Sequence, residues 1–359
     1  MARTTLGVGI IGLRHLHPRD YVPLFEQVEE TQLVAVAEQD RVLLKAFTED
    51  VDVEGYTDWT ELLRREDIHL IALFLPHSEC PGVAVQAAQM GKHILVEKPM
   101  AASAEGARRM VKAAQTHGVK LTTPYVWRYH PVSREIKRLI QEGVLGDLIA
   151  CEGRCAAGRS DRYLHGNAPW MVHKAQSGGG PMLNLGVHWI DLFRWLLQDE
   201  VVRVSGEISH TTPGIDIEDN AFALLRFSQG AVATLDISYS VPPAYPRGRD
   251  LYISLRGTRG IVSWSPAWGD EADELLLCTD APGYETAPLR RIALRSESVR
   301  GYSGVMGLQF MGDLAASILN DQPPPIPGEE GVRNLEIVEA IYRAAETAPK
   351  RRFGRDRQD

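Results

Sequence analysis

The sequence is poor in cysteine, with four in 359 residues, and none of them form a C-x-x-C pair. No cysteine and histidine spacing matches a zinc module, and no histidine pair has a carboxylate at a spacing that supports a metal site. Free thiols in a reducing compartment are the simplest account. We therefore expect a cytoplasmic protein with no bound metal. The cysteines are Cys80, Cys151, Cys155 and Cys278.

Long hydrophobic runs and an excess of positive charge are also absent. The apolar stretch 6–13 is too short to span a membrane, and the start lacks the long h-region and cleavage site of a signal peptide. Lysine and arginine number 39 against 47 aspartates and glutamates, a formal net charge of -8. No global field therefore draws the chain to nucleic acid or to an anionic membrane, and we expect neither as a partner.

Strands and helices alternate regularly over the first third of the chain, and the length suggests about two domains at ~150 residues each. This alternation is typical of a parallel sheet with right-handed crossovers. Residues 1–124 are therefore expected to form a doubly wound α/β domain of the Rossmann type. The expected strands are 6–11, 33–37, 68–75, 94–96 and 119–122, with helices at 58–65, 80–90 and 103–117.

The second part of the chain changes to strands separated by turns. Residues 125–359 therefore predict an α+β domain with a large, mostly antiparallel sheet, closed by a helix at 331–347. The broad face of that sheet suits substrate binding and self-association, so we expect a homodimer or homotetramer. The expected strands are 148–157, 201–210, 221–227, 231–240, 251–256 and 261–265, after a helix at 132–142.

A glycine turn follows the first strand. The stretch 7–12 satisfies G-x-G-x-x-G, yet it lies inside the strand, whereas the pattern needs its glycines after the strand. With the fingerprint started at Gly12, its second and third positions become Arg14 and His17. These side chains and His15 offer positive charge or hydrogen bonds beside a helix N-terminus. We expect Gly12, Arg14 and His15 to contact a dinucleotide.

An acidic residue, Glu38, ends the second predicted strand. A carboxylate there accepts hydrogen bonds from a ribose diol and repels a 2′-phosphate, which favours NAD over NADP. Arg14 and Arg41 are able to neutralise a 2′-phosphate, so NADP stays possible. The structural alternative is a solvated strand end.

A buried strand runs directly into Glu97-Lys98-Pro99. Open α/β sheets bind ligands at the carboxyl edge of their strands. Pro99 restricts the backbone, so Lys98 is presented at a fixed strand exit, where it can position a substrate hydroxyl and stabilise developing negative charge. The alternative is a surface lysine at a strand end.

A second group of polar residues follows the glycine run 178–180. Asn184, His188 and Asp191 fall at i, i+4 and i+7 on a helix that is apolar nearly all round, which predicts one polar stripe on a buried helix. Buried polar groups need partners, and substrate hydroxyls in a cleft would supply them. A hydrogen-bonded interior network without chemistry remains the alternative.

Two further segments are candidates for the cleft. Arg128 lies in an aromatic and basic connection after the last strand of the first domain, where it either faces the ligand or ties the domains together. The segment 159–174 is predicted to be a loop with hydrogen-bond donors and stacking surface suited to a carbohydrate. Its candidates are Arg162, Tyr163, His165, Asn167, Trp170 and His173, of which we expect Trp170 and His173 to contact substrate.

Taken together, these residues resemble the Gfo/Idh/MocA family of nicotinamide-dependent oxidoreductases, named for glucose-fructose oxidoreductase and inositol dehydrogenase. The resemblance covers nearly the whole chain. It is carried by the turn at Gly12, Glu38, Pro76, Glu97-Lys98-Pro99, Trp127-Arg128-Tyr129-His130-Pro131, the block 178–195 and Gly328-Glu329-Glu330-Gly331.

The resemblance implies a two-domain dehydrogenase that binds NAD(P) on the first domain and a sugar, polyol or related carbonyl compound in the cleft. It implies that Lys98 binds the reacting oxygen and that His188 accepts or donates the proton. Cofactor contacts are implied at Pro76, His77 and Glu97 as well as at Lys98. Together with the sequence patterns above, the resemblance makes Lys98, Arg128, Trp170, His173, Asn184 and His188 the candidate substrate contacts.

The sequence departs from the family pattern in three places. Asn184 stands where aspartate is frequent, so it can orient a neighbour but supplies no charge. His77 and Cys80 replace the asparagine and histidine of P-N-x-x-H, which alters the nicotinamide side. The turn with Arg14 and His17 alters the pyrophosphate side.

Three functions compete. The leading hypothesis is an NAD(P)-dependent dehydrogenase or reductase that acts on CH–OH groups. The second is a glycoside hydrolase or lyase that retains NAD and oxidises a sugar only transiently. The third is a non-catalytic nucleotide or sugar sensor, suggested by Asn184 and Cys80.

Overall fold

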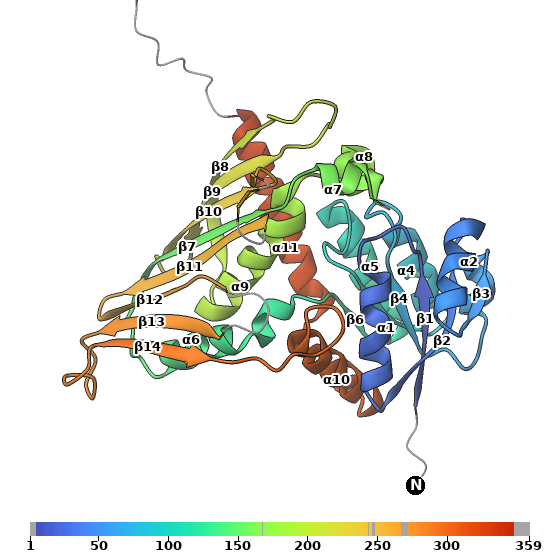
Figure 1. Ribbon diagram of the computed structural model, residues 1–359, viewed down its shortest axis with the longest axis horizontal. Helices are drawn as coiled ribbons and strands as arrows, with labels where there is room; N and C mark the ends of the chain where they lie inside the picture. Colours follow the sequence, from blue (N-terminus) through green and yellow to red (C-terminus); the bar gives the residue numbers. More distant parts are fainter. Residues whose placement is uncertain (1–4, 167, 243, 246–247, 267–271, 348–359) are drawn as a thin grey trace, which may run out of the picture.

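The computed structural model describes residues 5–166, 168–242, 244–245, 248–266 and 272–347, which form two sheets with helices between and around them (Figure 1). The first sheet has the order β3-β2-β1-β4-β5-β6, and all its strand pairs are parallel. This order confirms the predicted doubly wound fold, with its ligand crevice where β1 and β4 diverge. The strands are β1 (Leu6–Ile11), β2 (Thr31–Ala37), β3 (Glu54–Tyr56), β4 (Leu70–Leu73), β5 (His93–Val96) and β6 (Leu121–Thr122).

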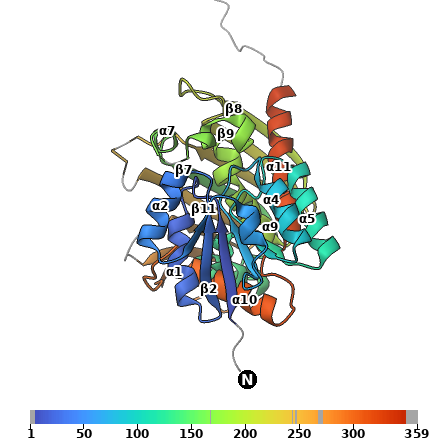
Figure 2. The same ribbon diagram turned by 90° about the vertical axis from the view of Figure 1, so that its right-hand side faces the viewer.

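Helices cover this sheet on both sides (Figure 2). Because β1, β4 and most of β5 are buried, their sequences are apolar runs, and that is the pattern from which the strands were predicted. The helix α2 and the short strand β3 were not predicted. The helices are α1 (Pro18–Gln27), α2 (Arg41–Asp50), α3 (Trp59–Leu63), α4 (Cys80–Gln89) and α5 (Ala104–His117).

The second sheet has the order β14-β13-β12-β11-β7-β10-β9-β8. Among the strands that the structure describes in this sheet, only the pair β10 and β7 is parallel, so the sheet is mostly antiparallel, as predicted. The strands β13 and β14 lie beyond those that the sequence predicted. The strands are β7 (Leu148–Ala157), β8 (Val201–Ser209), β9 (Asn220–Phe227), β10 (Val232–Ser238), β11 (Arg249–Gly257), β12 (Gly260–Trp264), β13 (Asp273–Thr279) and β14 (Leu289–Leu294).

One face of the second sheet packs against α9 (Val187–Leu197) and α11 (Gly328–Thr347), whereas no helix of the described residues covers its other face (Figure 1). The packing is close: a Cβ at Gly153 would lie 2.5 Å from Trp189, and one at Gly206 would lie 2.7 Å from Ile341. The closing helix α11 also packs against α5 of the first domain. The chain therefore returns to the first domain at its end, and the division at residue 124 stays a prediction.

The remaining helical segments differ from the sequence expectation in two places. The predicted buried helix begins with a π-helical turn, Met182–Gly186, before α9, and the segment 159–174 contains short helices instead of a continuous loop. No helix in the part of the chain that the structure describes is long and apolar enough to cross a membrane. The segments are η1 (Val126–Tyr129), α6 (Pro131–Gln141), α7 (Asp161–Leu164), η2 (Pro169–Val172), α8 (Lys174–Ser177) and α10 (Val305–Leu319).

Candidate active site

Lys98 lies at the carboxyl edge of the first sheet, two residues after β5 ends at Val96. Its side chain is buried, with 5% of the residue exposed. It is not the solvated strand-end lysine that the sequence left open. Burial lowers the pKa of Lys98 to about 8, although the neighbouring Glu97 acts in the opposite direction. A lysine with this pKa can change its protonation state near neutral pH.

The ammonium group of Lys98 is bonded to the second domain. Its Nζ donates a hydrogen bond to Oδ1 of Asn184 at 2.8 Å and to the backbone oxygen of the same residue at 3.1 Å. Asn184 belongs to the π-helical turn before α9. The two residues that the sequence singled out on different domains are therefore in direct contact.

The amide nitrogen of Asn184 is held by two tyrosines. Nδ2 donates to the hydroxyl of Tyr163 at 2.8 Å and to the hydroxyl of Tyr239 at 2.7 Å. An ammonium group can only donate, so Oδ1 must face Lys98 and Nδ2 must face the phenols. Asn184 therefore orients Lys98 by hydrogen bonds and adds no negative charge.

His188 lies one helical turn after Asn184 and is buried. Its ring packs edge to face against Tyr125, with the ring centroids 6.2 Å apart. Burial, and then the charges of Lys98 and His17, hold the pKa of His188 well below its usual value. The imidazole is therefore neutral near pH 7. Among the described residues, its buried Nδ1 has no hydrogen-bond partner.

Asp191, the third residue of the predicted stripe, points to a different network. It accepts hydrogen bonds from Nε and Nη2 of Arg128 at 2.7 and 2.6 Å, and from Nδ2 of Asn334 at 3.1 Å. Arg128 also pairs with Glu330 of α11 at 3.1 Å. This geometry favours Arg128 as a tie between segments over Arg128 as a substrate ligand. The stripe is thus divided, with Asn184 and His188 near Lys98 and Asp191 in the ion-pair network.

The turn after β1 has the features of a dinucleotide site. Gly12 has a φ of +93°, and a Cβ there would lie 2.8 Å from the backbone oxygen of Phe74, so the close approach of β1 and β4 requires glycine. Glu38 is buried at the end of β2, where Oε2 accepts from Leu13 N at 2.7 Å and Oε1 from Asp40 N at 3.0 Å. Each carboxylate oxygen retains a lone pair for a ribose hydroxyl.

A hollow opens beside the carboxyl ends of β1, β2 and β4. Arg14 lies at its rim, with Nε 3.9 Å from Oε1 of Glu38 and Nη2 3.5 Å from Oε2 of Glu79. These carboxylates hold Arg14 in place and offset its attraction for a 2′-phosphate. The lining residues include Gly12, Arg14, Glu38, Gln39, Thr57, Trp59, Leu75 and Val83.

Trp170 lies between the turn after β1 and the tyrosines that hold Asn184, since it belongs to the same buried cluster as Tyr163 and Tyr239. Its Nε1 donates to the backbone oxygen of Arg14 at 2.6 Å, and its ring centroid lies 4.7 Å from that of His77 and 6.0 Å from that of His15. Nδ1 of His77 donates to the backbone oxygen of Ser177 at 2.7 Å, because a carbonyl can only accept. Burial lowers the pKa of His77 to about 3, so its ring is neutral.

Two buried histidine ring nitrogens near the carboxyl edge of the first sheet lack a hydrogen-bond partner in the described part of the chain. Nε2 of His15 and Nε2 of His77 have no hydrogen-bond partner among the described residues. Unpaired buried polar atoms cost free energy, so they fit a site that a polar ligand completes. Together with the glycine turn and Glu38, they fit a dinucleotide cofactor.

The other predicted residues lie in varied surroundings. The carboxylate of Glu97 is buried and accepts from the hydroxyls of Tyr21 at 2.8 Å and Tyr302 at 3.4 Å. Pro76 is buried between β4 and α4, whereas His173 is exposed. Asn167 lies outside the described residues.

Tyr163, Tyr239 and Tyr125 are site residues that the sequence alone does not assign to the site. The sequence places Tyr163 in the predicted cleft segment but gives it no role. Tyr239 follows β10 and lies 55 residues from Asn184 in sequence, so no local spacing connects the two.

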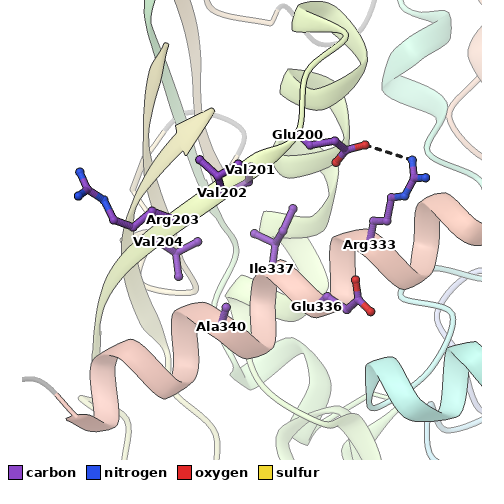
Figure 3. Close-up of a pocket in the computed structure, with 9 residues that line it drawn as sticks. All are labelled: Glu200, Val201, Val202, Arg203, Val204, Arg333, Glu336, Ile337 and Ala340. Carbon is purple, nitrogen blue, oxygen red and sulfur yellow. Dashed lines mark hydrogen bonds and ion pairs between the residues drawn. The ribbon is translucent and has the colours of Figure 1, made fainter. Parts of the chain in front are cut away.

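A separate hollow lies between β8 and α11, where Arg333 pairs with Glu200 at 3.1 Å (Figure 3). None of the candidate residues line it. It is lined by Glu200, Val201, Val202, Arg203, Val204, Arg333, Glu336, Ile337 and Ala340.

Comparisons with known proteins assign the class. Residues 6–125 match the family model described as oxidoreductase family, NAD-binding Rossmann fold, and residues 133–263 match the GFO/IDH/MocA C-terminal domain. The fold and the matched domains define an NAD(P)-dependent oxidoreductase. The chain belongs to the Gfo/Idh/MocA family.

Several relatives are similar over much of their length. The chain is 27% identical to dTDP-3,4-didehydro-2,6-dideoxy-alpha-D-glucose 3-reductase of Saccharopolyspora spinosa, over 95% of this chain and 98% of that one. It is 24% identical to levoglucosan dehydrogenase of Pseudarthrobacter phenanthrenivorans, over 74% of each chain. A solved levoglucosan dehydrogenase, in complex with NADH and L-sorbose, has the same fold, with a TM-score of 0.83 at 20% identity. The match covers 95% of this chain and 97% of that one.

Proposed function

We propose that this protein transfers hydride between NAD and a hydroxyl-bearing carbon of a sugar, polyol or related compound. The observation that carries the proposal is the buried Lys98, which lies at the edge of the nucleotide-binding sheet and is bonded to Asn184 of the other domain. The names of the relatives, which describe a sugar reductase and a sugar dehydrogenase, support the substrate class.

Each residue of the cluster has one role in this proposal. Lys98, in its protonated form, binds the reacting oxygen and stabilises the negative charge that develops on it. His188, neutral near pH 7, accepts the hydroxyl proton during oxidation and returns it during reduction. Asn184 holds the ammonium group in position. When bound, NAD supplies the hydride acceptor.

Cofactor contacts are proposed at the turn and at the edge of the sheet. The backbone at Gly12 and the side chains of Arg14 and His15 lie beside the N-terminus of α1, where a pyrophosphate is stabilised. Glu38 binds the ribose diol. The segment around Pro76 and His77, together with Glu97, borders the nicotinamide side.

The first prediction concerns the choice of cofactor. Replacing Glu38 by alanine is expected to weaken NADH binding by about tenfold to a hundredfold and to narrow the preference for NADH over NADPH, because a charged hydrogen bond contributes about 1.5–3 kcal/mol. Fluorescence titration with NADH and NADPH measures both affinities. Glu79→Ala, which removes a carboxylate from the same rim but leaves Glu38 at the strand end, is the matched control for NADH affinity and should leave that affinity unchanged. Equal NADH affinity in wild type and Glu38→Ala would contradict the ribose contact.

The experiment that tests the function is a panel of sugars, polyols and inositols with NAD and NADP, followed by the absorbance of the reduced cofactor. Sustained reduction on one or more substrates supports the dehydrogenase. Glycoside cleavage with no net change in cofactor redox state would favour a hydrolase or lyase that retains NAD. Binding of NADH and of a sugar without any turnover would favour a sensor.

The second prediction concerns self-association, which we propose to occur through the uncovered face of the second sheet. Phe222 and Leu224 are each 47% exposed there, although both lie in the middle of a strand. A second copy of the chain is the occupant that would bury these side chains. Light scattering on a sizing column is expected to give a dimer or tetramer for wild type and a smaller species for Phe222→Asp with Leu224→Asp. Val42→Asp on α2, where Val42 is 77% exposed, should leave the mass unchanged.

A further inference from the structure

A second positive group lies beside the Lys98 cluster. Arg162 is in α7, and its Cζ lies 4.5 Å from the ring centroid of Tyr163 and 5.6 Å from that of Tyr239. These are the two tyrosines that hold the amide of Asn184. The guanidinium also lies against Gly158, where a Cβ would be 2.8 Å from Nη1, so the absence of a side chain there makes room for it.

Hydrogen bonds connect the two positive groups. Nη2 of Arg162 donates to the hydroxyl of Tyr163, that hydroxyl accepts from Asn184, and Asn184 accepts from Lys98. The groups are close enough to interact, because the charge of Arg162 adds to the effect of burial in lowering the pKa of Lys98.

Arg162 has no carboxylate partner among the described residues, where its Nη2 donates to the neutral hydroxyl of Tyr163. Glu97 lies beside Lys98 and acts to raise its pKa, so it offsets part of the charge of the lysine. The same carboxylate is bonded to Tyr21 and Tyr302. Contacts with aromatic faces hold a guanidinium in place but leave its net charge. A partly buried charge without a counter-ion is costly, so a ligand that carries the counter-ion gains free energy by binding here.

We propose that Arg162 binds a carboxylate or phosphate group of the substrate, so that the substrate is an acidic sugar or polyol. The planar guanidinium suits both groups, since it presents two parallel N–H donors. Lys98 then binds the reacting oxygen while Arg162 binds the anionic group. This inference rests on the proposed function and narrows its substrate class.

The test compares substrates that differ only in the charged group. D-glucose, D-glucuronate and D-glucose 6-phosphate are assayed with NAD-loaded protein, and D-galactose and D-galacturonate form a second series. We expect kcat/KM for one acidic compound to exceed that of its neutral partner by about tenfold or more. The carboxylate and phosphate arms show which anionic group is preferred.

The variants Arg162→Met and Arg162→Lys test the residue itself. Arg162→Met is expected to lower kcat/KM for the acidic substrate by about tenfold to a hundredfold more than for the neutral sugar, mainly through KM, because only the acid loses an ion pair. Any change that reaches Lys98 through Tyr163 and Asn184 affects both substrates alike. Arg162→Lys should recover part of the loss, because it restores charge without the planar fork. Arg159→Met removes a neighbouring arginine that already pairs with Asp161 at 3.1 Å, and it should have no effect.

Binding gives a second measurement that does not require turnover. Each compound is titrated into the NADH complex, and the change in NADH fluorescence is followed in wild type and Arg162→Met. If an acid binds in a manner that depends on Arg162 while nothing is oxidised, the anion site stands and the dehydrogenase proposal fails. If neutral sugars are oxidised and Arg162→Met affects acids and neutral sugars alike, the anion site fails and the dehydrogenase stands. If no acid binds or reacts better than its neutral partner, the inference is overturned.

Discussion

Replacing Lys98 with methionine is expected to lower kcat for hydride transfer by about 10²–10⁴-fold, the usual range for loss of acid-base assistance to a reacting oxygen. Methionine keeps much of the length of the side chain but cannot carry charge or donate a hydrogen bond. It leaves Oδ1 of Asn184 without its bond to Nζ, which measures 2.8 Å in the native protein. NADH affinity should remain within about threefold, because the glycine turn and Glu38 are untouched.

Steady-state kinetics and NADH titration on the same preparations measure both quantities. The pH dependence adds a check on the mechanism. The pKa of Lys98 is lowered to about 8, so kcat/KM should fall as pH rises through about 8 and the ammonium group loses its proton. In Lys98→Arg, a weaker enzyme, this alkaline fall should disappear because arginine stays protonated. Full turnover in Lys98→Met would refute the assignment of Lys98.

Replacing Arg128 with methionine is expected to lower the free energy of unfolding by about 3–5 kcal/mol, because it leaves the carboxylate of Asp191 buried without its charged partner. Asp191 is fully buried, with 0% of its side chain exposed, and Arg128 is its partner at 2.6 Å. The hydrogen bond from Asn334 remains but cannot balance a charge. Urea unfolding followed by fluorescence measures the loss.

The double variant Arg128→Met with Asp191→Asn should recover part of the stability, since it removes the unbalanced charge together with its partner. Arg138→Met breaks exposed ion pairs on α6 and should cost about 0–1 kcal/mol. If the unfolding free energy of Arg128→Met stayed near that of wild type while KM for the substrate rose strongly, the structural role of Arg128 would be contradicted. That result would support Arg128 as a substrate ligand.

The sequence determined the architecture of both halves and much of the candidate site. Apolar runs ending in Gly12, Glu38 and Lys98 predicted parallel strands whose carboxyl ends meet, and the sheet order confirms that arrangement. Strands and turns of this kind can be predicted from the sequence because burial and backbone preference leave patterns within a few consecutive residues. The strands β13 and β14 and the helix α10 were missed, and with them the full width of the second sheet.

Only the tertiary structure decided which of the polar residues belong together. Regular helical spacing placed Asn184, His188 and Asp191 on one stripe, but the neighbours differ: tyrosines from distant segments surround Asn184, whereas Arg128 reaches Asp191. Likewise, no spacing in the sequence connects Trp170 with Arg14, although the indole of Trp170 donates to the backbone oxygen of Arg14 in the structure. Partners of this kind come from segments far apart in the chain, and their meeting depends on how the two sheets and their helices pack. Local sequence patterns therefore do not predict these contacts.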